Sequence, residues 1–264
     1  GGGFAVIHQA LIENVGWRDT FAVSGVIVLV LAIPIPLLFL RRIPEDIGLA
    51  PDGDMPSISH SFLRTDESWS LREAIHTWAM WKIVIAYMGG SFATGGFIIH
   101  RPGFWVESGF DESLVAWAFL VDSFVFATAA LAAGVLLERI AARYLGALAT
   151  VTHGLAVILA IAWIDERSVF LTAILIGVGA GTNAVVQTFI WAEYFGRSFL
   201  GTIRGVTLPT MLIGLGLGAP MVGMLYDHAN SSYVPGFWIL AGILFLSAAV
   251  LATATPPRRV PNGG

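Results

Sequence analysis

Residues 114–137 read LVAWAFLVDSFVFATAALAAGVLL, and this stretch contains a single ionisable side chain, Asp122. A helix that rises about 1.5 Å per residue would cross the roughly 30 Å hydrocarbon core of a bilayer over this length. The apolar residues form a continuous run and lack the three-to-four-residue rhythm of a surface helix. The stretch therefore predicts a membrane-spanning helix.

Six further runs of similar length and composition occur along the chain, at 20–40, 78–99, 145–164, 169–191, 206–226 and 233–254. The connections between them carry charged residues or turn formers. Hydrophobic residues make up 56% of the chain and charged residues 12%, about half the ~25% charged content of soluble domains. We therefore expect an all-α integral membrane protein with seven spans.

The spacing of these runs predicts three regions. Residues 1–41 hold the first span, preceded by an apolar segment at 1–11 that is too short to cross a bilayer. Residues 42–76 are rich in Pro, Asp and Ser and read as a loop between two transmembrane halves, and residues 77–264 hold six spans. Because the sequence starts without an initiator Met, we expect the chain to be truncated at its N-terminus.

Lys and Arg are distributed unevenly between the two sides of the predicted bundle. Alternating the spans places 11 of the 14 basic residues on one side and leaves Arg18, Arg101 and Arg167 on the other. Loops rich in Lys and Arg face the cytoplasm. The C-terminus is therefore expected to be cytoplasmic.

Several classes of site are disfavoured by the residue types. The chain has no cysteine, and no His/Glu pair at metal-ligand spacing, so we predict neither a zinc site nor a disulfide. The glycine runs at 177–181 and 214–218 lack the strand that precedes a nucleotide-binding loop, and close helix packing explains them better. We expect no cofactor, no nucleic-acid partner and no enzymatic activity.

Asp122 is the only acidic residue in the middle of a predicted span. A carboxylate at that depth costs roughly 2.5–3.5 kcal/mol on insertion scales, so such residues usually face a cavity or a partner. It is our candidate proton-coupling residue. The alternative is a structural Asp that locks helices together through a hydrogen bond.

Other polar residues within the spans are candidates for contacting a solute. Asn183 and Gln187 lie one helical turn apart and share a face. The remaining candidates in this group are Tyr87, Thr207 and Thr210. The alternative for all of them is hydrogen bonding between helices. The spans at 20–40 and 233–254 have no ionisable side chain within the bilayer and suit a lipid-facing position.

Five short motifs, in order along nearly the whole chain, carry a resemblance to a known family. They are GWRDTF at 16–21, RRIPEDIGLAPDG at 41–53, GVLLERIAAR at 134–143, EYFGR at 193–197 and a Gly-Ala-Pro at 218–220. Together they resemble the major facilitator superfamily, and within it the bacterial monocarboxylate and oxalate–formate-antiporter-like branch.

The resemblance implies a fold and several roles. The seven spans would be helices 6 to 12 of that fold, with helices 7, 8, 10 and 11 lining a central cavity and helices 6, 9 and 12 facing lipid. Gly134, Glu138, Arg139 and Arg143 would form the cytoplasmic gating motif, a charge cluster that latches neighbouring helices in one transport state.

One position departs from the monocarboxylate carriers of that superfamily. Those proteins place an Arg four residues after the Asp of helix 8, whereas Phe126 stands at that spacing from Asp122 here. The Arg that pairs with an anion is therefore expected from an N-terminal half, or the solute is not a simple carboxylate.

The function implied is secondary active transport, by symport or antiport, of a small monocarboxylate or organic anion across the cell inner membrane. Protons, the lipid bilayer and an N-terminal half of the same chain would be the partners. Two alternatives stay open: a multidrug or sugar carrier of the same superfamily, and a membrane sensor or scaffold that does not transport.

Overall fold

The computed structural model describes residues 11–12, 16–34, 37 and 68–258. The chain divides into two compact units, residues 1–60 and 61–264. The first unit contains helix α2 (Trp17–Ala32), which begins directly after Gly16. The described residues leave out 35–36 and 38–40 of the predicted span 20–40, the motif at 41–53 and most of the loop 42–76.

The second unit is a bundle of helices, and no strand occurs in the described residues. After the short α4 (Leu71–Ala74) come α5 (Trp78–Glu107), α6 (Glu112–Leu136), α7 (Ala142–Ala162), α8 (Glu166–Phe195), α9 (Leu200–His228) and α10 (Val234–Ala252). Helices α5 to α10 are long and apolar enough to cross a membrane. The chain is therefore an all-α, multi-pass membrane protein, and these six predicted spans are confirmed.

The ends of the helices follow from local sequence. Thr77 accepts a hydrogen bond from the Met80 backbone N–H at the start of α5, and Asp111 accepts one from Ser113 at the start of α6. Such caps satisfy N–H groups that have no partner within the helix. Helix α8 ends at Gly196, whose φ of 77° is readily adopted only by glycine.

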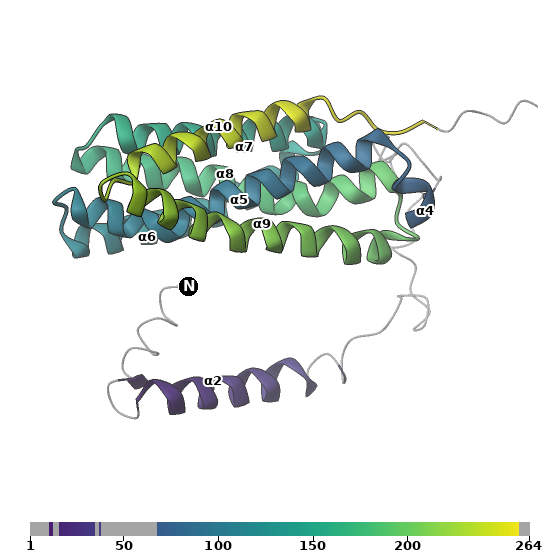
Figure 1. Ribbon diagram of the computed structural model, residues 1–264. Coiled ribbons are helices and arrows are strands. Elements are labelled where there is room, and N and C mark those ends of the chain that lie inside the picture. The colour runs from purple at the N-terminus through teal and green to yellow at the C-terminus, as the bar shows by residue number, and fades with distance from the viewer. Residues whose placement is uncertain (1–10, 13–15, 35–36, 38–67, 259–264) are drawn as a thin grey trace, which may run out of the picture. The chain divides into compact units, whose positions relative to one another are not determined.

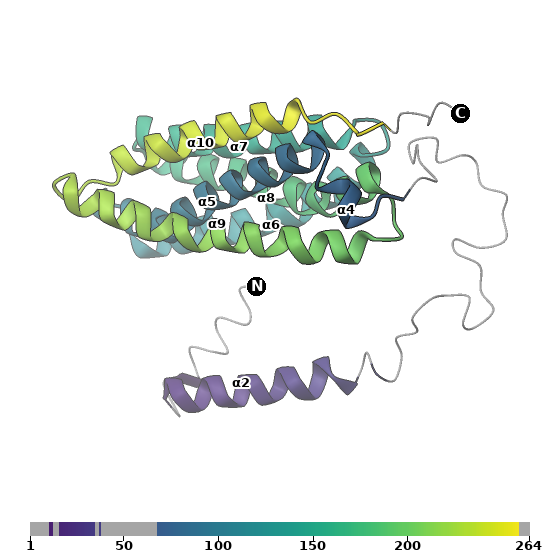
Figure 2. The ribbon, with the colours of Figure 1, turned by 45° about the vertical axis from the view of Figure 1, so that its right-hand side comes forward.

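Packing contacts join the six long helices in the order α9, α5, α10, α7, α8 and α6 (Figures 1 and 2). Helices α5 and α8 run through the middle, α7 and α10 lie along one edge, and α6 and α9 lie along the opposite edge. Helix α5 packs mainly against α9 and α10, and α8 packs mainly against α6 and α7. The two central helices therefore carry most of the side chains that can enclose a site.

Helix α5 extends further than its sequence suggests. The span was predicted to end at residue 99, with a connection starting at Gly103, but the helix continues through Pro102 to Glu107. The predicted boundary at residue 99 is therefore wrong. Long membrane helices tolerate proline where neighbouring groups compensate for the lost hydrogen bond. The extension places Arg101 inside the helix, where it is fully buried.

Five of the six glycines in the runs at 177–181 and 214–218 lie where helix backbones approach closely. A Cβ atom at Gly218 of α9 would collide with the carbonyl oxygen of Phe92 in α5. A Cβ atom at Gly181 of α8 would collide with the carbonyl oxygen of Phe126 in α6. The expectation that these glycines serve close helix packing is confirmed.

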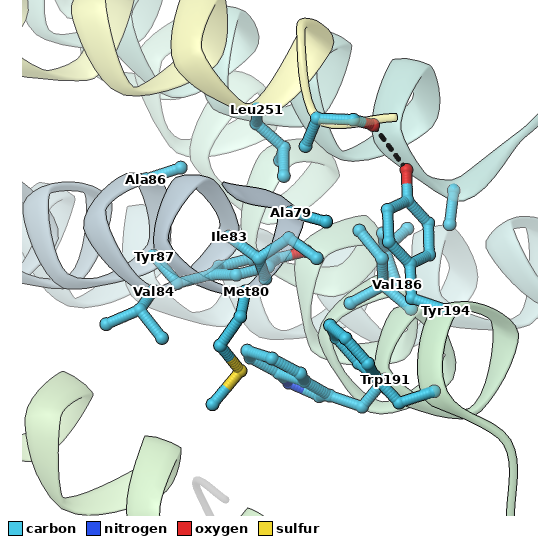
Figure 3. Packing of buried hydrophobic residues seen from close by; sticks show 14 of the residues in the cluster. Ala79, Met80, Ile83, Val84, Ala86, Tyr87, Val186, Trp191, Tyr194 and Leu251 are labelled. Carbon is cyan, nitrogen blue, oxygen red and sulfur yellow. Dashed lines mark hydrogen bonds between the residues drawn. The ribbon is translucent and has the colours of Figure 1, made fainter. Parts of the chain in front are cut away.

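One end of the bundle contains a hydrophobic cluster closed by the end of α10 (Figure 3). Met80, Ile83 and Trp191 belong to it and are buried. Tyr194 also belongs to it, and its hydroxyl donates a hydrogen bond to the Ala254 carbonyl just beyond α10. This contact joins α8 to the end of α10.

Replacing Tyr194 by Phe removes that hydroxyl from a buried site. We expect the free energy of unfolding to fall by about 1 kcal/mol, the usual contribution of one intramolecular hydrogen bond. Denaturant unfolding in bicelles, followed by circular dichroism, measures the change. Tyr144→Phe is the control, because the Tyr144 hydroxyl is exposed and accepts only from Arg143. Equal effects of the two substitutions would contradict the prediction.

Candidate transmembrane polar site

A cavity of about 200 Å³ lies inside the six-helix bundle. Five helices contribute to its wall, namely α5, α7, α8, α9 and α10. Its polar lining residues are Tyr87, Ser91, Thr94, Thr150, His153, Asn183 and Gln187. Since none of the residues around it is Asp, Glu, Lys or Arg, the wall formed by the described residues is polar but uncharged.

The hydrogen bonds of Thr150 fix the orientation of the Asn183 amide. The Thr150 hydroxyl donates to the Gly146 carbonyl at 2.9 Å, so its oxygen can only accept from Asn183. The Asn183 Nδ2 group makes that contact at 3.2 Å. The Oδ1 atom of Asn183 then points away from Thr150, and it is buried without a partner among the described residues.

Two more lining residues carry buried polar atoms that lack a partner in the described part of the chain, the Tyr87 hydroxyl and the His153 Nε2. Tyr87 is 7% exposed and His153 is 3% exposed. Helix α8 passes close to His153 because residue 179 is glycine, where a Cβ atom would lie 3.0 Å from the His153 Nδ1. Buried polar groups nearly always have partners, so these three unpartnered atoms set the helices around the cavity apart from an ordinary packed core.

The structure brings together three of the five predicted solute contacts, namely Tyr87, Asn183 and Gln187. Gln187 donates through Nε2 to the Met211 sulfur at 2.9 Å, which spans the cavity wall between α8 and α9. Thr207 and Thr210 do not line the cavity. Thr207 is buried, and the Thr210 hydroxyl donates to its carbonyl within α9 at 2.7 Å.

Asp122 pairs with a residue that the sequence did not single out. Its Oδ2 lies 3.0 Å from the Arg101 Nη2, and this is the only ion pair among the described residues. Arg101 comes from α5 and Asp122 from the middle of α6. Neither residue lines the cavity.

Aromatic rings surround the Arg101 guanidinium. Its Cζ lies 4.2 Å from the centre of the Phe119 ring and 5.0 Å from that of Trp105, within the range of cation–π attraction. Its Nε and Nη1 atoms are buried and have no partner in the described residues. The ion pair is therefore joined by a single hydrogen bond and enclosed by apolar groups.

The sequence suggested that a cation to pair with an anion would come from an N-terminal half. That expectation stays a prediction, because the Arg that the six-helix unit does bury, Arg101 on α5, is already neutralised by Asp122. The sequence contained one signal that Arg101 lies within the helix. Tyr87, Thr94 and Arg101 follow at intervals of seven residues and share one helical face. That signal was hidden because Arg101 was assigned to a loop.

The predicted division between helices that line a central cavity and helices that face lipid concerns a cavity between two transmembrane halves, and it stays a prediction. The cavity within the six-helix unit has a different wall, because His153 of α7 and Leu244 of α10 line it. Helix α6 contributes no lining residue and has only three buried residues, Val115, Ala118 and Ala133.

The predicted gating motif is only partly connected. Arg143 donates to the Ala254 carbonyl at 3.4 Å and to the Tyr144 hydroxyl at 3.0 Å. Glu138 forms no ion pair with Arg139 or Arg143 in the described residues. Gly134, near the end of α6, has open space where a Cβ atom would stand.

Comparison with protein-family models and with curated proteins yields no match for this chain.

The polar residues within the bundle form two chemically different groups. The cavity offers hydrogen-bond donors and acceptors without net charge, and the Arg101–Asp122 pair offers a carboxylate that can take up a proton. Among the described residues no group of three His, Asp or Glu side chains could hold a metal ion.

Proposed function

We propose that this chain is part of a secondary active transporter that moves a small solute across the cell inner membrane by alternating access. In this proposal α2 is helix 6 and α5 to α10 are helices 7 to 12 of a major facilitator fold. An N-terminal half would complete the transporter, and the C-terminus would be cytoplasmic. Such transporters bind their solute near the bilayer midplane between two repeats that rock against each other.

The buried ion pair between Arg101 and Asp122 carries the proposal. Ionisable residues inside membrane helices are costly, and they commonly mark proton relays and solute pathways. The Asp122 side chain is 16% exposed while Arg101 is fully enclosed, so the carboxylate is the member of the pair that a proton can reach. Protonation of Asp122 would break the pair and couple the proton gradient to a change in helix packing.

Two classes of solute are compatible with this coupling. The family resemblance favours a monocarboxylate or another organic anion. The uncharged wall of the cavity favours the second class, a neutral solute such as a sugar. A multidrug substrate stays an alternative, because the N-terminal half of the proposed transporter would add its own residues to the solute site.

A transporter also accounts for these residues better than the rival classes. A membrane-embedded enzyme would need catalytic groups gathered at one depth, whereas the ion pair and the cavity-lining amides do not converge on one point. A sensor or scaffold would keep the bundle but would carry no solute flux that depends on Asp122.

Uptake into proteoliposomes under an imposed pH gradient tests the proposal. The gene product with both halves would be supplied with labelled lactate, as a carboxylate, and labelled xylitol, as a neutral solute. We expect gradient-driven uptake of at least one of them. In Asp122→Asn, which cannot ionise, uptake should fall to the level measured without a gradient.

Glu112→Gln is the matched control, because Glu112 is an exposed acidic residue at the start of the same helix. It should transport like the wild type. If Asp122→Asn keeps its gradient-driven uptake, Asp122 is structural and the coupling role is wrong. If neither solute is taken up by the wild type, the transport proposal fails for both solute classes.

A further inference from the structure

We infer that the start of α5 binds an anionic phospholipid on the face turned away from the cavity. Four residues form this site, which we call the α5 lipid patch: Trp78, Trp81, Lys82 and Ile85. Lys82 would hold the lipid phosphate, and the apolar side chains would pack against the lipid. The inference requires only that the bundle lies in a membrane, and it does not depend on transport.

The apolar members of the patch are left exposed by the rest of the bundle. Trp78 is 82% exposed, Trp81 is 50% exposed and Ile85 is 58% exposed. With Lys82 they follow the i, i+3, i+4, i+7 spacing of one helical face, whereas Ile83 between them is buried. Two tryptophans and an isoleucine exposed side by side mark a contact surface for an apolar partner.

The patch lies on the opposite side of α5 from the cavity. Tyr87 and Thr94 line the cavity. Ile85 is two residues before Tyr87, which places it about 160° away around a helix with 3.6 residues per turn. One turn further along the patch face, a Cβ atom at Gly89 would lie 2.6 Å from the Ser247 Oγ of α10. The patch therefore lies beside α10, and a second transmembrane half that closed over the cavity would approach α5 from the other side.

Lys82 supplies the positive charge of the patch. Its ammonium donates to the Thr253 carbonyl at the end of α10 at 3.0 Å, and it forms no ion pair in the described part of the chain. An ammonium group has three donor hydrogens, so two remain for another acceptor. A lysine near the end of an apolar helix extends its ammonium toward the lipid headgroups. A lipid phosphate offers the oxygens and the negative charge that this group lacks.

The two tryptophans place the headgroup level at the start of α5. The Trp81 indole N–H donates to the Ile75 carbonyl at 2.9 Å, which holds the ring across the turn between α4 and α5. Trp78 is the first residue of the helix. Tryptophan is enriched where membrane helices cross the bilayer–water interface. Lys82 is then at the depth of the phosphates, and Ile85, one turn deeper, is at the depth of the acyl chains.

The charges at the two ends of the bundle favour an anionic lipid over a zwitterionic one. The start of α5 and the end of α10 lie at the same end (Figure 2). Basic residues outnumber acidic ones where α6 meets α7 and α8 meets α9 at that end: Arg139, Arg143, Arg197 and Arg204 against Glu138 and Glu193. Acidic residues dominate where α5 meets α6 and α7 meets α8 at the other end: Glu107, Asp111, Glu112, Asp165 and Glu166 against Arg167. Basic sites between membrane helices bind anionic headgroups.

Two lipids with the same acyl chains test the inference. Dioleoyl phosphatidylglycerol is anionic, and dioleoyl phosphatidylcholine is zwitterionic. The gene product with both halves would be titrated with each lipid in a neutral detergent, and bound lipids would be counted by native mass spectrometry. We expect phosphatidylglycerol to bind about tenfold more tightly, as a hydrogen bond between two charged groups provides. Inorganic phosphate at millimolar concentration should not displace it, because phosphate lacks acyl chains.

Variants assign the preference to the patch. Lys82→Gln should lower phosphatidylglycerol affinity about tenfold, to the level of phosphatidylcholine, although the Gln amide can still donate to the Thr253 carbonyl. Lys82→Arg keeps the charge and should keep the preference. Trp78→Ala should weaken both lipids alike and leave their ratio unchanged. Arg139→Gln is the matched control, because Arg139 is exposed at the same end but lies outside the patch.

Each alternative to a lipid site gives its own result. Equal affinity for the two lipids in the wild type, or an unchanged preference in Lys82→Gln, would overturn the inference. Equal losses in Lys82→Gln and Arg139→Gln would show a diffuse attraction to the basic end in place of a site. Displacement by inorganic phosphate would show a site for free anions. Circular dichroism of each variant confirms that it is folded, and Lys82→Arg tests the charge with the smallest change of structure.

Discussion

Replacing Arg101 by Leu is expected to lower the free energy of unfolding by about 3–5 kcal/mol, the usual cost of removing one partner of a buried ion pair. Arg101 is fully enclosed and forms the only ion pair in the described residues, with Asp122. The substitution leaves the Asp122 carboxylate without its cation inside a membrane helix. Denaturant unfolding in bicelles, followed by circular dichroism, measures the loss.

The double variant Arg101→Leu/Asp122→Leu separates this explanation from a loss of packing. Because both charges are then gone, most of the lost stability should return, as happens when buried ion pairs are replaced by apolar residues. Arg139→Leu is the control, since Arg139 has no ion pair in the described residues. A double variant no more stable than Arg101→Leu would show that the guanidinium matters for its contacts with Phe119 and Trp105.

Gly218→Ala is expected to destabilise the bundle by about 1–3 kcal/mol through overpacking. The added Cβ atom would collide with the Phe92 carbonyl oxygen and lie 2.7 Å from the Gly96 backbone nitrogen. Helices α5 and α9 would have to move apart to accept it. The same unfolding assay measures the effect.

Gly216→Ala is the matched control, two residues away on α9. A Cβ atom there has open space within 4 Å. Alanine is the better helix former by roughly 0.5–1 kcal/mol, so this substitution should be neutral or slightly stabilising. The prediction is therefore a difference in sign between two neighbouring glycines. Destabilisation of equal size at both positions would show that close approach of α5 and α9 is not the cause.

Much of the fold could be predicted from the sequence because length and polarity dominate in a membrane helix. The span predicted at 114–137 corresponds to α6 (Glu112–Leu136). The five other spans predicted after residue 77 also appear as helices. The predicted ends of helices were wrong where the local sequence does not show how neighbouring helices pack. The span predicted to end at residue 99 in fact continues as a helix to Glu107.

The candidate site was predictable only in part. Tyr87, Asn183 and Gln187 stood out because polar side chains are rare within apolar spans, and all three line the cavity. His153 was not among the predicted site residues, since nothing in one sequence shows which faces of two helices meet. The partner of Asp122 was missed because it lies 21 positions earlier, on another helix.

The end of α10 bears on how the protein assembles during synthesis. Lys82 of α5 donates to the Thr253 carbonyl at 3.0 Å, and Arg143 of α7 and Tyr194 of α8 donate to the Ala254 carbonyl. All three donors leave the ribosome before α10 does. They lack these carbonyl partners until the last helix inserts. The final helix therefore completes the hydrogen bonds at this end of the bundle. Assembly of this end is complete only once translation has passed residue 254.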